Sequence, residues 1–266
     1  MSLEEIVAEA IAQRAAMTRR RPIIVGICGA QGSGKSTLAA ALCRRLDRAT
    51  TLSLDDLYLT RQDRERLARD VHPLLRTRGV PCTHDIPLGI RLLDSIGSGA
   101  DVALPRFDKA RDDRSPPSEW PVAPADTQVV LLEGWCVGAM PEEEAALQRP
   151  VNALESAEDP SGTWRSFVNR ALAGPYQPLF DHIDFLVLLA APGWDVVATW
   201  RMQQEQALRL SGAAGPGVMD DAQLIRFISH YERLTRHILD EMPGRADLLI
   251  QLDDGRAPLA VRLKEE

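Results

Sequence analysis

A glycine-rich segment near the start of the chain has residue types that can wrap a phosphate group. Residues 29–36, GAQGSGKS, fit the pattern GxxxxGK[ST]. An apolar run, IIVGIC, leads into the segment, and an Ala- and Leu-rich run, TLAAALCRRL, follows it. In a loop between a strand and a helix, backbone N–H groups and the helix dipole bind phosphate oxygens, and glycines permit the close approach. We therefore expect a nucleotide phosphate site formed by Gly29, Ala30, Gln31, Gly32, Ser33, Gly34, Lys35, Ser36 and Thr37.

Side chains around this segment could neutralise the negative charge of a nucleotide, directly or by binding a metal ion. Lys35 is placed to reach the β- and γ-phosphates of ATP, and the hydroxyl of Ser36 to bind Mg²⁺. Glu133 ends a second apolar run, VVLLE. Because ligands of an open parallel sheet bind outside the carboxyl ends of its strands, we expect Glu133 to support the metal. The alternative is that Glu133 caps the loop that follows.

Two acidic residues follow a third short run, TLSL. A positioned carboxylate is useful as a base or orienting group for an acceptor hydroxyl, whose own pKa is high. Only one of Asp55 and Asp56 need face the phosphate. A solvated acidic turn or a helix N-cap is the alternative for each of them.

Basic and polar residues gather in two turn-rich segments, RGVPCTHD at 78–85 and LPRFDKA at 104–110. A small anionic acceptor needs cations and hydrogen-bond donors, which these segments supply. For any single residue a surface ion pair is the competing interpretation, and His84 could instead cap the next helix. The candidates are Arg78, His84, Arg106, Lys109 and Arg114.

A further cation, Arg201, lies on a helical pattern just before a glycine-rich loop at 211–217. Such loops act as hinges or lids when they lie near a site, and a mobile cation can stabilise the transition state of phosphoryl transfer. We therefore expect a lid region at 201–219 and a catalytic role for Arg201. An ordinary helix-surface arginine is the alternative.

Six segments occur in one order along the chain: GICGAQGSGKSTLA, SLDDLYLT, RGVPCTHD, LPRFDKA, LLEGWCVG and WRMQQE. Together they resemble the D-glycerate 3-kinase family of plants and fungi and its bacterial relatives, within the phosphoribulokinase/uridine kinase group. The glycine-rich loop is generic, whereas SLDDLYLT with RGVPCTHD and LPRFDKA is far more specific. The resemblance covers the chain from residue 23 to about residue 241.

The resemblance implies a P-loop kinase fold that uses ATP and Mg²⁺. It implies that Asp55 is the base and that the segments carrying Tyr58, Asp85 and Asp108 line the acceptor site. One departure lies in the second segment, where Cys82 stands at a position that is usually glycine in the family. A side chain there could shift the loop or narrow the acceptor pocket.

Short apolar runs alternate with helical patterns along the chain. This alternation predicts an α/β fold, a P-loop NTPase three-layer sandwich whose parallel sheet is covered on both faces, with a small lid and an acceptor-site flap. The expected strands are 23–28, 50–54, 129–133, 185–190 and 248–252, with a short one at 101–104. The expected helices are 35–46, 86–96, 194–210 and 220–241.

The remaining segments are expected to belong to a single domain spanning 1–266. Apolar residues at helical spacing predict a lead-in helix within 1–21 that packs on the domain. Residues 105–124, rich in Pro, Asp and Arg, are irregular and carry candidate acceptor chemistry. Residues 140–162 are interpreted as a variable surface insertion, without an assigned function.

The composition limits the classes of function. The net charge of −7 argues against an extended nucleic-acid surface, and no apolar run approaches the length of a membrane span. None of the four cysteines forms a CxxC pair, so we expect no zinc site, and the absence of a signal sequence favours reduced thiols in the cytoplasm.

The sequence therefore predicts an ATP-dependent kinase that phosphorylates a hydroxyl of a small metabolite, with D-glycerate, giving 3-phosphoglycerate, as the acceptor that the resemblance suggests. A pantothenate-like or nucleoside acceptor is the alternative among kinases. A nucleotide-sensing switch ATPase is the alternative from another class, and the absence of an NKxD motif weighs against a GTPase. The sequence does not indicate the oligomeric state.

Overall fold

The computed structural model describes residues 2–18, 22–210 and 220–264. Six strands form one sheet in the order β10-β9-β8-β1-β7-β2. All neighbouring pairs are parallel except β9 and β10, which are antiparallel. The strands are β1 (Ile23–Gly29), β2 (Ala49–Ser53), β7 (Val129–Gly134), β8 (Phe185–Ala190), β9 (Leu248–Leu252) and β10 (Pro258–Leu263).

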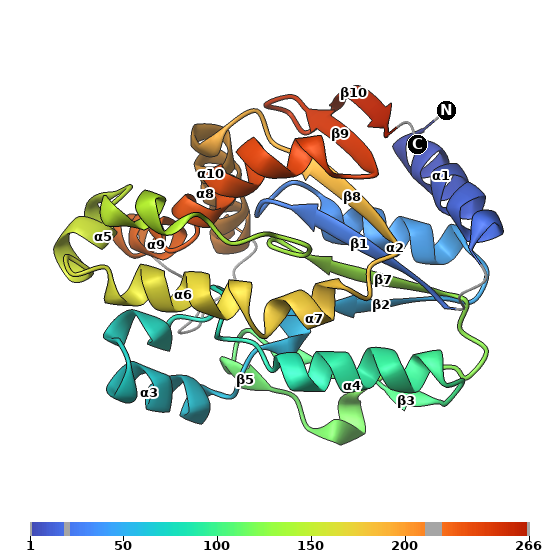
Figure 1. Ribbon diagram of the computed structural model, residues 1–266, viewed down its shortest axis with the longest axis horizontal. Helices are drawn as coiled ribbons and strands as arrows, with labels where there is room; N and C mark the ends of the chain where they lie inside the picture. The colour runs from blue at the N-terminus through green and yellow to red at the C-terminus, as the bar shows by residue number, and fades with distance from the viewer. Residues whose placement is uncertain (1, 19–21, 211–219, 265–266) are drawn as a thin grey trace.

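Helices cover both faces of this sheet (Figure 1). Successive side chains of a strand point to opposite faces, so Ile23 and Val25 pack in one core and Ile24 and Cys28 in the other. The first core is closed by α1 (Leu3–Met17), α2 (Lys35–Arg45) and α8 (Trp194–Leu210). The second is closed by α4 (Ile86–Gly97), α7 (Tyr176–Phe180) and α10 (Glu232–Glu241). The predicted three-layer α/β fold is confirmed.

Shorter elements complete the described chain. The strand expected at 101–104 is present as β3 (Val102–Ala103), which pairs with β6 (Val122–Ala123). The irregular segment that follows holds a small hairpin of β4 (Phe107–Asp108) and β5 (Asp113–Arg114). The other helices are α3 (Arg61–Asp70), α5 (Ala153–Glu158), α6 (Thr163–Ala173) and α9 (Asp221–Ser229). The 3-10 helices are η1 (Leu54–Leu57), η2 (Pro73–Arg76), η3 (Pro117–Glu119), η4 (Glu144–Gln148) and η5 (Met242–Gly244).

The expectation of one continuous helix over 220–241 is wrong. Helix α9 ends at Ser229 and α10 begins at Glu232. Between them Tyr231 N–H donates to the carbonyl of Ile228, a tighter turn than an α-helix makes, and Nδ1 of His230 lies 2.9 Å from the carbonyl of Arg226. The two helices are therefore separate elements joined by this turn.

Two other expectations concern the N-terminal segment and the predicted lid. Helix α1 lies within the predicted lead-in segment 1–21, and its Val7 and Ile11 are fully buried. The glycine-rich loop at 211–217 lies outside the described residues. Within the described parts of the chain, no helix is both long enough and apolar enough to cross a membrane.

Candidate active site

The glycine-rich segment joins β1 to α2 as the sequence predicts. Gly32 and Gly34 have φ angles of 83° and 89°, which side chains other than glycine rarely adopt. A Cβ atom at Gly32 would lie 2.8 Å from Cβ of Trp200, so the loop is also closely packed against α8. Gly34 is the N-cap of α2 and has no side chain with which to cap it. The first N–H groups of α2 can therefore serve an anion.

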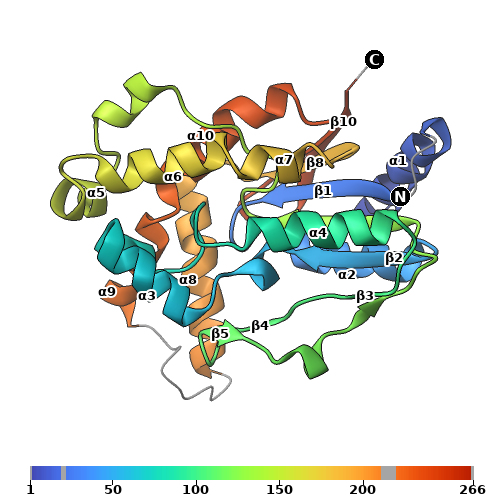
Figure 2. The same ribbon diagram turned by 60° about the horizontal axis from the view of Figure 1, so that its bottom comes forward.

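A cavity of about 580 Å³ opens over this loop. Figure 2 shows α8, α9 and the β4–β5 hairpin at the end of the sheet toward which the arrow of β1 points. This is the carboxyl end of the parallel strands, where ligands of such sheets bind. The cavity is lined by Gln31, Gly32, Lys35, Ser36, Asp55, Tyr58, Arg78, Lys109, Arg201, Gln204, Phe227 and Tyr231.

Oxygen donors meet beside Lys35 at the ends of β2 and β7. Glu133 is only 6% exposed, and its Oε1 accepts hydrogen bonds from Ser36 Oγ at 3.1 Å and from Ser53 Oγ at 2.8 Å. Ser53 and Glu133 are partners in the β2–β7 register. Mg²⁺ prefers oxygen ligands and binds through few protein groups, so this donor set fits that ion.

Asp55 lies in η1, directly after β2. Its Oδ1 accepts a hydrogen bond from the Tyr58 hydroxyl at 2.7 Å, and its Oδ2 accepts one from Lys109 Nζ at 2.7 Å. Burial on its own raises the pKa of Asp55, but the charges of Lys109 and Lys35 and the two hydrogen bonds hold that pKa well below the usual range of an aspartate. Asp55 is therefore ionised across the physiological pH range.

The neighbouring acid, Asp56, faces the β4–β5 hairpin instead. It accepts hydrogen bonds from Phe107 N at 2.9 Å and from Arg106 Nη1 at 3.0 Å. Burial raises the pKa of Asp56. The two acids therefore have different roles. Asp55 lines the cavity, whereas Asp56 holds the hairpin in position through its hydrogen bonds with Phe107 and Arg106.

Five residues expected in the acceptor site lie outside the cavity lining, namely His84, Asp85, Arg106, Asp108 and Arg114, the last of which bonds to the Tyr58 carbonyl and to Asp85. His84 is 4% exposed, its ring stacks on Tyr58 at 4.8 Å, and burial lowers its pKa to about 3. Asp85 accepts a hydrogen bond from Leu88 N and caps α4. Asp108 accepts hydrogen bonds from the backbone of its own hairpin. Their placement favours support of the cavity wall, and direct contact with an acceptor stays a prediction.

Cations dominate the rim of the cavity. The Arg78 guanidinium pairs with Asp112 and lies 5.7 Å from the centre of the Phe107 ring. Arg201, on α8, lies 5.7 Å from the centre of the Phe227 ring. With Lys35 and Lys109 these arginines line the cavity together with Asp55, the carboxylate among the lining residues. Such a set suits a polyphosphate and a second, anionic ligand. The lid proposed at 201–219 includes residues outside the described chain.

Known proteins resemble this chain in sequence and in structure. A family described as an AAA domain matches residues 24–81. An uncharacterized kinase of Schizosaccharomyces pombe is 37% identical over 265 residues, which cover 91% of this chain and 91% of that protein. The chloroplastic D-glycerate 3-kinase of Arabidopsis thaliana is 31% identical over 261 residues, or 90% of this chain and 54% of that protein. The chain belongs to the D-glycerate 3-kinase-like family of P-loop kinases. A solved structure agrees with this assignment: the D-glycerate 3-kinase from Cryptococcus neoformans superposes with a TM-score of 0.82 at 26% identity, over 99% of this chain and 100% of that one.

This P-loop kinase is therefore an ATP-dependent phosphotransferase that acts on a hydroxyl group. The sequence did not predict four of the candidate functional residues of the kinase. Gln204, Phe227 and Tyr231 line the cavity from α8 and from the α9–α10 region, and Ser53 binds Glu133. Phe227 and Tyr231 lie in the stretch DDAQLIRFISHYERL, whose only clear signal in the sequence is a helical pattern.

Proposed function

We propose that this kinase transfers the γ-phosphate of ATP to D-glycerate, giving 3-phosphoglycerate, and that it requires Mg²⁺. The observation that carries the proposal is the shared cavity. Lys35 and Ser36 of the phosphate-binding loop line it together with Asp55 and the cations Arg78, Lys109 and Arg201. A site for a triphosphate and a site for a small anionic acceptor therefore adjoin one another. The names of the Arabidopsis and Cryptococcus relatives point to the same acceptor.

In this proposal the donor half of the cavity holds the triphosphate. The N–H groups at the start of α2 bind phosphate oxygens, and Lys35 contacts the β- and γ-phosphates. Ser36 and Glu133 would hold Mg²⁺, which neutralises phosphate charge when bound. Arg201 adds a further cation to the lining of the cavity. Charge on the transferring phosphoryl group is thereby matched by fixed positive groups.

Asp55 works on the acceptor in this proposal. A hydroxyl of the acceptor forms its bond to the γ-phosphorus, the bond between that phosphorus and the bridging oxygen of ADP breaks, and the hydroxyl proton passes to Asp55. An ionised carboxylate is needed for this step, which the lowered pKa of Asp55 provides. Arg78 and Lys109 would bind the acceptor carboxylate and so orient the hydroxyl.

The test is an acceptor panel. Purified protein is given MgATP with D-glycerate, L-glycerate, pantothenate or uridine, and both ADP release and the phosphorylated product are measured. We expect D-glycerate to raise turnover most and to give 3-phosphoglycerate. If only uridine or pantothenate raises turnover, that compound is the acceptor and the proposal of D-glycerate is wrong. ATP hydrolysis that no acceptor stimulates would support a switch ATPase instead. Thermal shift with an ATP analogue, Mg²⁺ and each compound gives a second reading, since a true acceptor stabilises by mass action.

A further inference from the structure

The segment 140–162, to which the sequence assigns no function, forms hydrogen bonds with α9 and with the turn between α9 and α10. Glu158 of the segment forms two hydrogen bonds with Arg226 of α9, at 3.0 and 2.6 Å. The amide of Asn152 donates to the carbonyl of Ser229 at 2.9 Å, at the end of the same helix. These contacts hold the segment against α9 and against the break that follows it.

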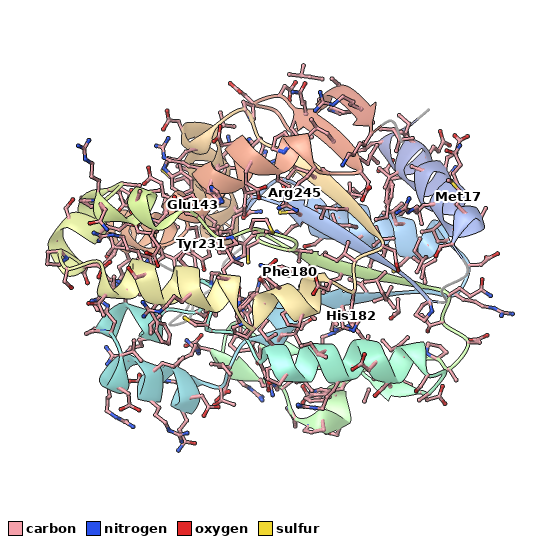
Figure 3. All side chains as sticks on the ribbon, in the orientation of Figure 1. Met17, Glu143, Phe180, His182, Tyr231 and Arg245 are labelled. Atoms are coloured by element: carbon pink, nitrogen blue, oxygen red, sulfur yellow. The ribbon has the colours of Figure 1, made fainter. Side chains whose placement is uncertain are left out.

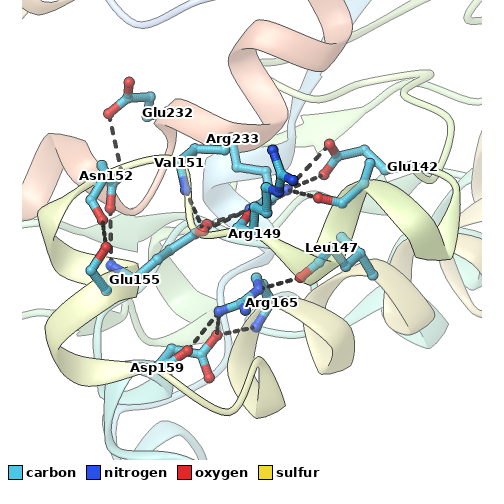
Figure 4. Close-up of polar contacts among 12 residues, drawn as sticks. Glu142, Leu147, Arg149, Val151, Asn152, Glu155, Asp159, Arg165, Glu232 and Arg233 are labelled. Atoms are coloured by element: carbon cyan, nitrogen blue, oxygen red, sulfur yellow. Dashed lines mark hydrogen bonds and ion pairs between the residues drawn. The ribbon is translucent and has the colours of Figure 1, made fainter.

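A buried arginine on α10 makes the strongest of these connections (Figure 4). Arg233 is 8% exposed, and its Nε and Nη2 donate to the two carboxylate oxygens of Glu155 at 2.8 and 2.7 Å. Nη2 also donates to the carbonyl of Arg149, and Nη1 to the carbonyl of Ala146 and to Glu142. A guanidinium has five N–H donors, and here the acceptors for all five come from residues 142–155. Such a pair tolerates little displacement of either partner, because it would leave a buried charge unpaired.

The same turn presents its other side chains to the active-site cavity. Phe227 and Tyr231 line that cavity. The Tyr231 hydroxyl donates to the carbonyl of Arg78 at 2.8 Å, and its ring packs edge-on against Trp135 at 4.9 Å. Figure 3 shows Tyr231 beyond the carboxyl ends of β1 and β7. Arg233 thus fixes the turn on one side while Tyr231, two residues earlier, fixes the backbone of Arg78 on the other.

We propose that residues 140–162 act as a strut that sets the acceptor side of the cavity, and that Arg233 is a positioning residue of this kinase. The strut acts through the α9–α10 turn on Tyr231 and Phe227, and through Tyr231 on Arg78. The glycine-rich loop meets this chain of contacts at Gln31, whose side chain bonds to Tyr231, whereas α2 does not take part in the contacts named here. The inference rests on the proposed function for the identity of the acceptor, but the position of the turn can be measured without any acceptor.

The first variant is Arg233→Met, with Arg236→Met as its matched control. Arg236 lies on the same helix and pairs with Glu232 one turn away. We expect Arg233→Met to lower kcat/KM for the acceptor about 10–100-fold, since small misplacements of positioning groups have effects of this size. The Kd of ATP should change much less than kcat/KM for the acceptor, since Lys35 and Ser36 are not among these contacts, although Tyr231 bonds to Gln31 of the glycine-rich loop. Hydrogen exchange of the protein without acceptor should become faster at 226–236 and 78–83, and remain unchanged in β1 and α2.

A milder variant decides the matter where Arg233→Met does not fold. Asn152→Asp keeps the side-chain oxygen that caps α5, but it removes the donor to Ser229 and places a carboxylate near Glu232. The proposal predicts the same pattern of exchange and kinetics in a smaller degree.

Wild-type exchange at 226–236 and 78–83 in a folded variant would overturn it, as would an equal loss of ATP and acceptor binding. A failure of D-glycerate as acceptor would leave the exchange result standing, so the two proposals fail separately.

Discussion

The ammonium group of Lys109 lies 2.7 Å from Oδ2 of Asp55. The other oxygen of this carboxylate already accepts the Tyr58 hydroxyl at 2.7 Å. An acceptor hydroxyl that approaches Asp55 must therefore compete with a donor that is already in place. Lys109 is the partner that can move, because its side chain is 61% exposed and belongs to a small hairpin. An anionic acceptor that attracts Lys109 would free the carboxylate at the moment it is needed.

Replacement of Lys109 by methionine tests this relationship through the pH dependence of kcat/KM. Lys109 stabilises the ionised form of Asp55, so its removal raises the pKa of Asp55. Since the ionised form is the base, activity should then be lost at a higher pH on acidification, by about 1–3 pH units. A matched control is Arg111→Met, on the same hairpin, where Arg111 pairs with Asp108. An acid limb at the same pH in Lys109→Met and in the wild-type protein would show that Lys109 does not govern Asp55.

Glu133→Gln tests the proposed metal site. The amide keeps the shape of the side chain but loses the charge that attracts a cation, so more Mg²⁺ should be needed for half-maximal activity, by about 10–100-fold. The affinity for ATP in the absence of Mg²⁺ should not fall, since a negative group near the phosphates has been removed. A Mg²⁺ titration of activity, combined with ATP binding in EDTA, measures both. A wild-type Mg²⁺ requirement in the variant would assign the metal to other residues.

Gly79→Ala tests the packing of the acceptor side of the cavity. Gly79 has a φ angle of 120°, and a Cβ atom there would overlap with the Tyr231 hydroxyl oxygen. We expect the free energy of unfolding to fall by more than about 1 kcal/mol, since alanine does not tolerate this backbone conformation. Gly97→Ala is the control, because nothing lies within 4 Å of a Cβ atom at Gly97. Its stability should stay the same or rise by up to about 1 kcal/mol, since alanine fits the helical backbone at Gly97 and restricts the unfolded chain. Denaturant unfolding measures both, and equal stabilities of the two variants would contradict the close packing at Gly79.

The sheet could be predicted because its central strands are buried on both faces and therefore appear as continuous apolar runs. The ranges 185–190 and 248–252 coincide with β8 and β9. Strand β10 could not be found in this way, because all its residues are exposed. Helix α3 was missed because its sequence, RQDRERLARD, is mostly charged and has few apolar residues to mark a buried face. Its buried residue Arg64 bonds to the carbonyls of Leu59, Arg76 and Asp112, contacts that exist only once the chain is folded.

The residues of the candidate site are likewise of two kinds: those that a local sequence pattern predicts, and those that only the folded chain brings to the site. The loop at 29–37 is a local motif, so its residues follow from the sequence alone, as does the position of Asp55 after a strand. Tyr231 was missed because it reaches the cavity through its hydrogen bond to Arg78, 153 residues away. His84 was expected at the acceptor because it is polar and lies in a turn-rich segment. Its ring is buried between Tyr58 and Tyr176, where it supports the side chain that bonds to Asp55, and its direct contact with an acceptor stays a prediction.

The central claim is that Asp55 takes the proton from an acceptor hydroxyl while the neighbouring loop holds ATP. The most direct test compares acceptor phosphorylation and ATP binding in Asp55→Asn, with the exposed Asp94→Asn as control. Asparagine keeps the shape of the side chain but cannot act as a base. The claim predicts that kcat falls about 10²–10⁴-fold, while the Kd of ATP stays near the wild-type value and Asp94→Asn is fully active. Near-normal turnover by Asp55→Asn would contradict it.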